Sequence, residues 1–344
     1  MPVTAARQRH ADPADAAAFQ VVRDVCRRHA KEYFFASGFL PKPKRDAVYA
    51  VYAFCRMIRE ALDVDDASVE GAAGLRHHPA VVSPASLEPD TGCASGSSLQ
   101  ARLDMLRERL DEIYDDRLEL PRPESRSAAQ HTLHALGLAV RRHEIPRQLF
   151  LDFAEGCRAD LAVARYATWK SLEKHCFYTA GVVGLMVACV LGLTHSGAGG
   201  QAVEMGMAMR FTSILRDLKA DWKRGRVYLP LEDVVKFRYT ERDLAAGVVN
   251  DNFRELMRFE VARARKMYRQ AAEGVCWLAG DGARLAASTV AVLHAGTLAA
   301  IERKGYDVFS RPVRVTPGQK FRLLSAAPRL ARRRGRTPVP NVFS

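Results

Sequence analysis

The sequence has few features of a disulfide-stabilised or nucleic-acid-binding protein. Its seven cysteines are scattered along 344 residues, and no two form a CxxC pair. This distribution favours reduced thiols over a disulfide framework. Zinc-finger spacing and the aromatic motifs of RNA-binding modules are missing, so we expect no nucleic-acid partner. The first 19 residues contain no apolar stretch, and we therefore expect no secretory signal.

Long hydrophobic runs are also scarce. The longest apolar run covers residues 176–193, CFYTAGVVGLMVACVLGL. Its 18 residues stand at the lower limit for a membrane span. The run contains three glycines and many small residues, which allow neighbouring helices to approach closely. We therefore interpret it as a buried central helix of a folded protein.

Positive charge and helix-forming residues are abundant. Lys and Arg number 52 against 39 Asp and Glu, which gives a formal net charge of +13 at pH 7. This excess indicates an anionic partner, such as a phosphate-bearing substrate or an anionic lipid surface. Hydrophobic residues make up 48% of the chain, enough for a sizeable core. Because strand-like alternation is rare, we predict an all-α fold.

The most informative stretch is MGMAMRFTSILRDLKADWKRGRVYLP, residues 205–230. It places Asp217 and Asp221 four residues apart in a helical pattern, so their Cβ atoms lie about 5–6 Å apart on one face. Such carboxylates repel each other unless one is protonated or a cation lies between them. Magnesium suits the pair, since it is often shared between carboxylates and substrate phosphates. The alternative is a solvated helix whose acids pair with neighbouring cations. The nearby cations are Arg216, Lys223, Arg224 and Arg226.

The string RDLKADWKRGRVYLP resembles the second aspartate-rich motif of the squalene/phytoene synthase family, RDxxxDxxxGRxYLP. Every fixed position of that motif is matched. A second likeness is AGVVG at residues 180–184, which resembles the family's AGxVG helix. The resemblance extends from about His29 to Lys320. The matched positions of the aspartate-rich motif are Arg216, Asp217, Asp221, Gly225, Arg226, Tyr228, Leu229 and Pro230.

The first aspartate-rich motif of the family, YAFCRxxDDxxD, is matched only in part by residues 52–63, YAFCRMIREALD. The first five residues and the last acid, Asp63, match. Arg59 and Glu60 stand where the family has paired aspartates. Ion pairs of Arg59 with Asp63 and of Arg56 with Glu60 would each span one helical turn. Such pairs would neutralise part of the first metal site.

Five further positions depart from the family pattern. Ala30 stands where the family has a phosphate-binding Ser, and His175 and His294 replace Tyr. Arg210 and Ser213 replace a Gln and an Asn. Two hypotheses follow. The chain is an active enzyme of altered specificity, or it has lost turnover and serves as a partner subunit or a prenyl-lipid-binding protein.

The resemblance implies a single-domain class I isoprenoid synthase fold with a central cavity. It implies a head-to-head (1–1′) condensation of two prenyl diphosphates, farnesyl or geranylgeranyl, in carotenoid or squalene/hopanoid biosynthesis. Mg²⁺ is the implied cofactor, with Mn²⁺ as an alternative, and a later reduction by NADPH is left open. We expect a cytoplasmic protein, with peripheral membrane contact as an added option. The oligomeric state is left open.

The resemblance also implies roles for individual residues. Metal binding falls to Asp63, Asp217 and Asp221, with Glu60 as a weaker candidate, and Arg216 acts with the catalytic acids. For Tyr52, ordinary core packing is an equally good interpretation. The implied substrate contacts are Lys31, Tyr52, Arg56, Ala180, Val183, Gly184, Arg226 and Tyr228.

Composition also predicts the chain's boundaries. A polar, disordered lead-in covers residues 1–16, and the synthase-like domain covers residues 17–325. Residues of about 67–98, rich in Gly, Ser and Pro, form a flexible insertion in that domain. A basic, poorly ordered tail covers residues 326–344.

Overall fold

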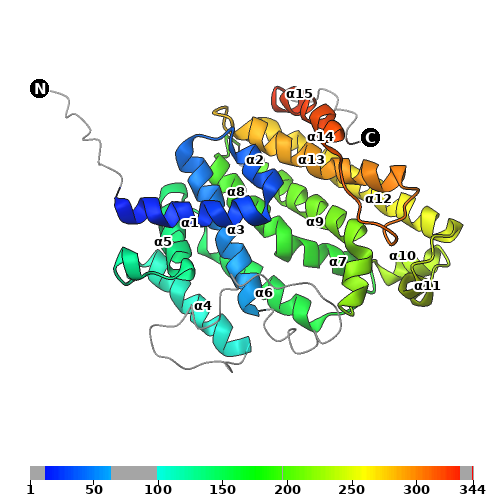
Figure 1. Cartoon of the computed structure of the whole chain (residues 1–344), viewed down its shortest axis with the longest axis horizontal. Coiled ribbons are helices and arrows are strands. Elements are labelled where there is room, and N and C mark those ends of the chain that lie inside the picture. Colours follow the sequence, from blue (N-terminus) through cyan, green and yellow to red (C-terminus); the bar gives the residue numbers. More distant parts are fainter. Residues whose placement is uncertain (1–11, 63–98, 196, 334–342, 344) are drawn as a thin grey trace, which may run out of the picture. The chain divides into compact units, whose positions relative to one another are not determined.

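Helices account for nearly all the regular structure of the chain (Figure 1). Two isolated β-bridges, between Arg165 and Val227 and between Leu193 and Leu278, are the extended pairings found in the described part of the chain. The predicted all-α fold is therefore confirmed. The computed structural model describes residues 12–62, 99–195, 197–333 and 343.

The chain divides into two compact units. The first combines residues 1–31 and 46–144. Within it, α5 packs against both α1 and α4. His134 Nε2 lies 2.7 Å from Asp15 Oδ1, and this contact joins α5 to α1. Its helices are α1 (Pro13–His29), most of α3 (Lys42–Leu62), α4 (Leu99–Tyr114), the 3-10 helix η3 (Pro123–Ser125) and α5 (Ala128–His143).

The second unit combines residues 32–45 and 145–344. Its central element is α9, which packs against α7, α8, α12 and α13. The helices are α2 (Lys31–Ser37), α6 (Arg147–Ala162), α7 (Trp169–Cys176), the π-helix η4 (Phe177–Gly181), α8 (Val182–Leu191), α9 (Ala198–Lys223), α10 (Leu231–Lys236), α11 (Glu241–Ala246), α12 (Asp251–Ala272), the 3-10 helix η5 (Glu273–Trp277), α13 (Ala283–Arg303), α14 (Pro317–Leu324) and α15 (Ala327–Ala331).

The structure differs from the expected boundaries at the two ends of the chain, because residues 13–16 of the expected lead-in are helical. The first helix begins at Pro13, because the Asp12 side chain accepts a hydrogen bond from the Ala14 N–H at 2.8 Å. At the other end, α15 is helical and Phe343 is fully buried against Tyr268, with ring centroids 5.6 Å apart. The expectation of a poorly ordered tail is wrong for these residues. The predicted insertion at 67–98 lies outside the described residues.

The apolar run forms one continuous helical segment in which η4 joins α7 to α8. Residues 169–191 and helix α13 are long and apolar enough to cross a membrane by length and composition alone. Half of the apolar window in the first helix is buried, and 67% of that in α13. Because core helices of folded proteins pass the same test, the length and composition of these two helices are only weak evidence for a membrane span.

Glycines set the distance between α9 and the segment formed by η4 and α8. A Cβ atom on Gly206 would lie 2.2 Å from the Ala180 carbonyl oxygen, and one on Gly184 would lie 2.3 Å from that of Ala202. Real Cβ atoms essentially never approach a backbone oxygen so closely. The small residues of the apolar run therefore serve helix packing, as the sequence predicts.

A buried acidic pair joins α12 to α10. Glu260 is 0% exposed and Asp233 is 5% exposed, and the Arg263 guanidinium donates hydrogen bonds to both. Burial raises the pKa of Glu260 to about 8, Arg263 opposes this rise, and Asp233 adds to it. Glu260 is therefore mostly protonated at pH 7.

Replacing Gly206 with Ala should lower the free energy of unfolding by about 1–3 kcal/mol, because α9 and η4 must move apart. Gly200→Ala on the same helix is the matched control. A Cβ there meets nothing within 4 Å, so stability should stay equal or rise by up to about 1 kcal/mol. Urea unfolding of both variants tests this, and equal stabilities would contradict it.

Glu260→Gln should remove a pH dependence of stability. The folded-state pKa of about 8 lies above the ordinary value of 4.5, so the carboxyl stabilises the fold fully below pH 4.5. That stabilisation is lost as pH rises through 8. Gln stays neutral, so the variant should gain on the wild type by up to about 1.4 kcal/mol per pH unit in this window. Parallel unfolding free energies at pH 5.5 and pH 8 would refute the assignment.

Candidate active site

The two aspartates of the second motif lie on adjacent turns of α9, near its C-terminal end. Asp217 is held by Arg216, whose Nε and Nη2 donate to its two carboxylate oxygens at 2.8 and 2.6 Å. The Asp217 side chain is 40% exposed and that of Asp221 is 14% exposed. Burial raises the pKa of Asp221 to about 6; the Arg210 guanidinium opposes this rise, and the Asp217 charge adds to it.

The chain turns sharply after this pair. Gly225 has φ +75°, a left-handed conformation that favours glycine, and α9 ends there. The Arg226 N–H donates to the Asp221 carbonyl at 2.9 Å, and the Val227 N–H donates to the Ala164 carbonyl at 2.9 Å. The turn therefore carries the RVYLP segment back beside the end of α6.

Asp160, at the end of α6, receives the polar side chains of that segment. Arg226 Nη1 donates to Asp160 Oδ2 at 2.9 Å, and the Tyr228 hydroxyl donates to its oxygens at 2.9 and 3.0 Å. The Tyr166 hydroxyl lies 3.3 Å from Oδ1. Sequence reasoning missed Asp160. It assigned Arg226 and Tyr228 to substrate binding, whereas in the structure both donate hydrogen bonds to Asp160.

Two departures from the family pattern meet in the same network. Arg210 Nη2 lies 3.2 Å from His175 Nε2, and His175 Nδ1 lies 3.4 Å from Asp160 Oδ1. Because a guanidinium can only donate, Nε2 must accept and Nδ1 must carry the proton. His175 is therefore a neutral bridge between Arg210 and Asp160. The Arg210 guanidinium also lies 5.1 Å from the centre of the Tyr228 ring.

The oxygen donors of Asp217 and Asp221 suit magnesium if a diphosphate and water complete its ligands. Asp217 and Asp221 provide oxygen donors on one helix face, but no group of three or more His, Cys, Asp or Glu side chains is arranged to hold a metal in the described part of the chain. Mg²⁺ commonly binds one or two carboxylates and completes its shell with water and substrate phosphate. The pair therefore fits a metal that arrives with a diphosphate.

Two more of the departures, Ser213 and His294, lie elsewhere on the second unit. Ser213 Oγ donates to the Met209 carbonyl on its own helix at 3.1 Å. His294 Nε2 lies 3.7 Å from Glu32 Oε2, and Lys320 Nζ contacts Glu32 Oε1 at 2.9 Å. Burial lowers the pKa of His294 to about 4, although Glu32 opposes this. The ion pair attaches α14 to α2.

The first-motif residues lie on α3 in the first unit. The predicted ion pair between Arg56 and Glu60 is present, so Glu60 already has a cationic partner. Arg59 is exposed and Tyr52 is partly buried. Asp63, the matching acid, lies outside the described residues, and so does its predicted pair with Arg59.

The other predicted substrate contacts fall on both units. Lys31 is exposed at the start of α2. Ala180 lies in η4, and Val183 and Gly184 in α8. All three are partly exposed, and Gly184 faces the α9 backbone.

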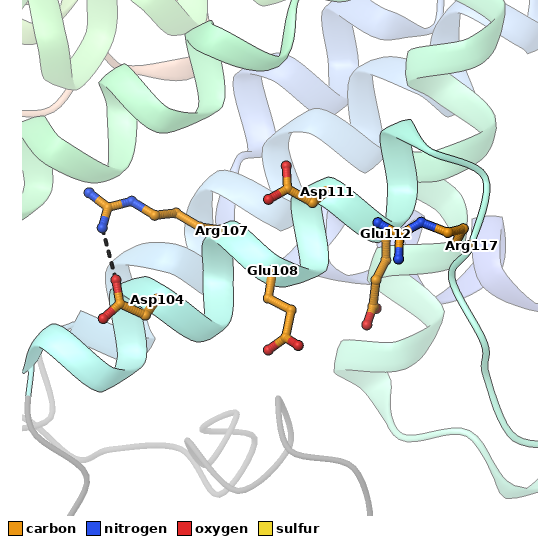
Figure 2. Close-up of a pocket in the computed structure, with 6 residues that line it drawn as sticks. All are labelled: Asp104, Arg107, Glu108, Asp111, Glu112 and Arg117. Carbon is orange, nitrogen blue, oxygen red and sulfur yellow. Dashed lines mark hydrogen bonds and ion pairs between the residues drawn. The ribbon is translucent and has the colours of Figure 1, made fainter.

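A shallow depression of about 410 Å³ lies on the first unit, over α4 (Figure 2). Four acids and two arginines line it, and Arg107 pairs with Asp104 at 2.9 Å. It contains none of the residues predicted to bind substrate, and its charges are typical of a solvated helix face. The lining residues are Asp104, Arg107, Glu108, Asp111, Glu112 and Arg117.

Known proteins resemble the chain over most of its length. A family model described as squalene/phytoene synthase matches residues 26–319. The 15-cis-phytoene synthase of Synechocystis is 33% identical, with 90% of this chain and 84% of the relative aligned. The phytoene synthase of Arthrospira platensis is 31% identical, with 91% and 93% aligned.

Solved structures agree with the helical fold. A dehydrosqualene synthase in complex with a ligand superposes with a TM-score of 0.74 at 25% identity, covering 92% of this chain and 98% of that one. The squalene synthase HpnC of Alicyclobacillus acidocaldarius has a TM-score of 0.67 at 24% identity, covering 86% and 99%. The expected isoprenoid synthase fold is therefore confirmed.

Replacing Asp160 with Asn should lower the free energy of unfolding by about 3 kcal/mol, because Arg226 would keep its charge in a mostly buried place without a matching anion. Asp152→Asn is the control: it makes the same change on the exposed face of α6, where Asp152 accepts from Gln148 at 2.8 Å, and should cost less than about 0.5 kcal/mol. Chemical denaturation measures both. A loss at Asp160 no larger than at Asp152 would contradict the charge-balancing role.

Proposed function

The chain belongs to the squalene/phytoene synthase family, and we propose that it condenses two prenyl diphosphates head to head (1–1′). The observation that carries the proposal is the intact acidic pair of α9, with Arg216 bound to Asp217 through both carboxylate oxygens. The names of the cyanobacterial relatives favour a phytoene-type product.

Each part of the second unit's site has a task in this reaction. When bound, Mg²⁺ would neutralise charge on the departing diphosphate. Asp217 and Asp221 would hold that ion, and Arg216 fixes the orientation of Asp217. The apolar segment of η4 and α8 would exclude water from the allylic cation. Asp160 keeps Arg226 and Tyr228 in place beside the acidic pair.

A second candidate function keeps the fold and loses the turnover. It is favoured by the first motif, in which Arg59 replaces an aspartate and Glu60 is bound to Arg56. Such a protein would bind a prenyl lipid or act as a partner subunit. The two candidates differ in whether purified protein releases inorganic diphosphate.

The test is product analysis with purified protein, Mg²⁺ and farnesyl or geranylgeranyl diphosphate. We expect a C30 or C40 head-to-head product, and the substrate that yields it settles the chain length. Asp221→Ala should reduce the rate by about a thousandfold or more, because metal and diphosphate lose a ligand. Asp251→Ala, at a 95% exposed side chain, is the control. Wild-type protein that binds both substrates but releases no diphosphate would favour the second candidate.

Arg59→Asp distinguishes two accounts of the first motif. If Arg59 only repels a metal, Asp should raise the rate, because at about 4 Å each unit of like charge costs on the order of 4 kcal/mol at an effective dielectric near 20. If Arg59 itself contacts diphosphate, the rate should fall. Rates across a Mg²⁺ titration decide, with circular dichroism to confirm folding. A fall at saturating Mg²⁺ would refute the repulsion account.

A further inference from the structure

Arg210 has more hydrogen-bonding capacity than its surroundings use. Its Nη2 contacts His175, and its guanidinium stacks on Tyr228. Its Nε atom is buried and has no hydrogen-bond partner in the described part of the chain. A buried donor left unsatisfied costs about 1–3 kcal/mol. An anion that reached this atom would satisfy it.

The charged groups around Arg210 are mostly paired with one another rather than with Arg210. Asp160 is the anion of this network, and Arg226 pairs with it directly at 2.9 Å. His175 is neutral in the tautomer that the geometry requires. Asp217 is matched by Arg216 through two hydrogen bonds. No carboxylate is hydrogen-bonded to Arg210 in the described part of the chain, although Asp160 and Asp221 act on its charge from a longer distance.

Arg210 lies on the same face of α9 as the acidic pair. It precedes Asp217 by seven residues and Asp221 by eleven, which are two and three helical turns. Its guanidinium is close enough to Asp221 to act on that carboxyl electrostatically. An anion held by the α9 acids through a metal would therefore meet Arg210 at its other end.

We propose that Arg210 is a fixed cationic contact for the substrate's diphosphate, so that this chain binds a diphosphate group even without a divalent metal. The inference rests on the proposed prenyl diphosphate function and adds to it. Arg216 and Asp217 form an internal pair, whereas Arg210 has a fork of donors of which Nε remains unused. A guanidinium binds phosphate oxygens through two parallel hydrogen bonds. His175 and Tyr228 hold that fork in a single orientation.

The experiment is calorimetric titration of the purified full chain with inorganic diphosphate, in EDTA and in Mg²⁺. Wild type should bind in EDTA, and Arg210→Gln should bind at least about tenfold more weakly there. Arg224→Gln is the matched control, since it removes a cation 4.0 Å from Asp221 on a 61% exposed side chain. It should change the affinity less than about twofold. Arg210→Lys, which keeps the charge, should fall between wild type and Gln.

A direct observation on the wild type covers the case in which Arg210→Gln does not fold. In protein labelled with ¹⁵N-arginine, the Arg210 Nε–H resonance, assigned by its loss in Arg210→Lys, should move when diphosphate is added in EDTA. A resonance that stays fixed overturns the proposal. So does a wild type that binds no diphosphate in EDTA, or an Arg210→Gln variant with wild-type affinity there.

The failure of this inference is separable from failure of the proposed function. If diphosphate binding in EDTA is independent of Arg210 while the wild type still makes product with Mg²⁺, the inference is wrong and the function stands. If binding in EDTA depends on Arg210 but neither prenyl diphosphate yields product, the contact is real and the chain is a binding protein.

Discussion

The charge on Asp160 is the constraint on which the second unit's site depends. A largely buried carboxylate is tolerated only when it is paired and hydrogen-bonded, and Arg226, Tyr228 and His175 all meet it. These three side chains come from the RVYLP segment and from α7. Satisfying one anion therefore fixes the end of α6, the exit from α9 and the C-terminal end of α7 relative to one another. The acidic pair of α9 is held within that frame.

Local spacing predicted the parts of the site that lie on single helices. The adjacent turns of Asp217 and Asp221 follow from their i,i+4 spacing, and so does the ion pair between Arg56 and Glu60. The buried helix was predicted from its glycines, and the close approach of Gly184 to the Ala202 carbonyl explains why one of them is needed. In the first two cases the interacting residues lie one helical turn apart, and in the third the signal lies within the apolar run itself.

The rest of the site could not be predicted in this way, because its partners are far apart in the sequence. Asp160 and Arg226 are 66 residues apart, and His175 and Arg210 are 35 apart. No periodicity relates such positions. Taken singly, His175 and Arg210 read as two losses from the family pattern. Taken together, they form one hydrogen-bonded pair, in which Arg210 donates to His175.

A fixed cation does not act on a diphosphate as a metal does. A metal ion can arrive with the substrate and adjust its water ligands, whereas Arg210 is already held by His175 and Tyr228 before any substrate arrives. A contact that binds the diphosphate equally in the ground state and the transition state lowers KM without raising kcat. Arg210 accelerates the reaction only if its unused Nε–H meets an oxygen whose charge grows as the carbon–oxygen bond breaks. Removing Arg210 would then lower kcat and kcat/KM together, whereas a purely ground-state contact would change KM alone.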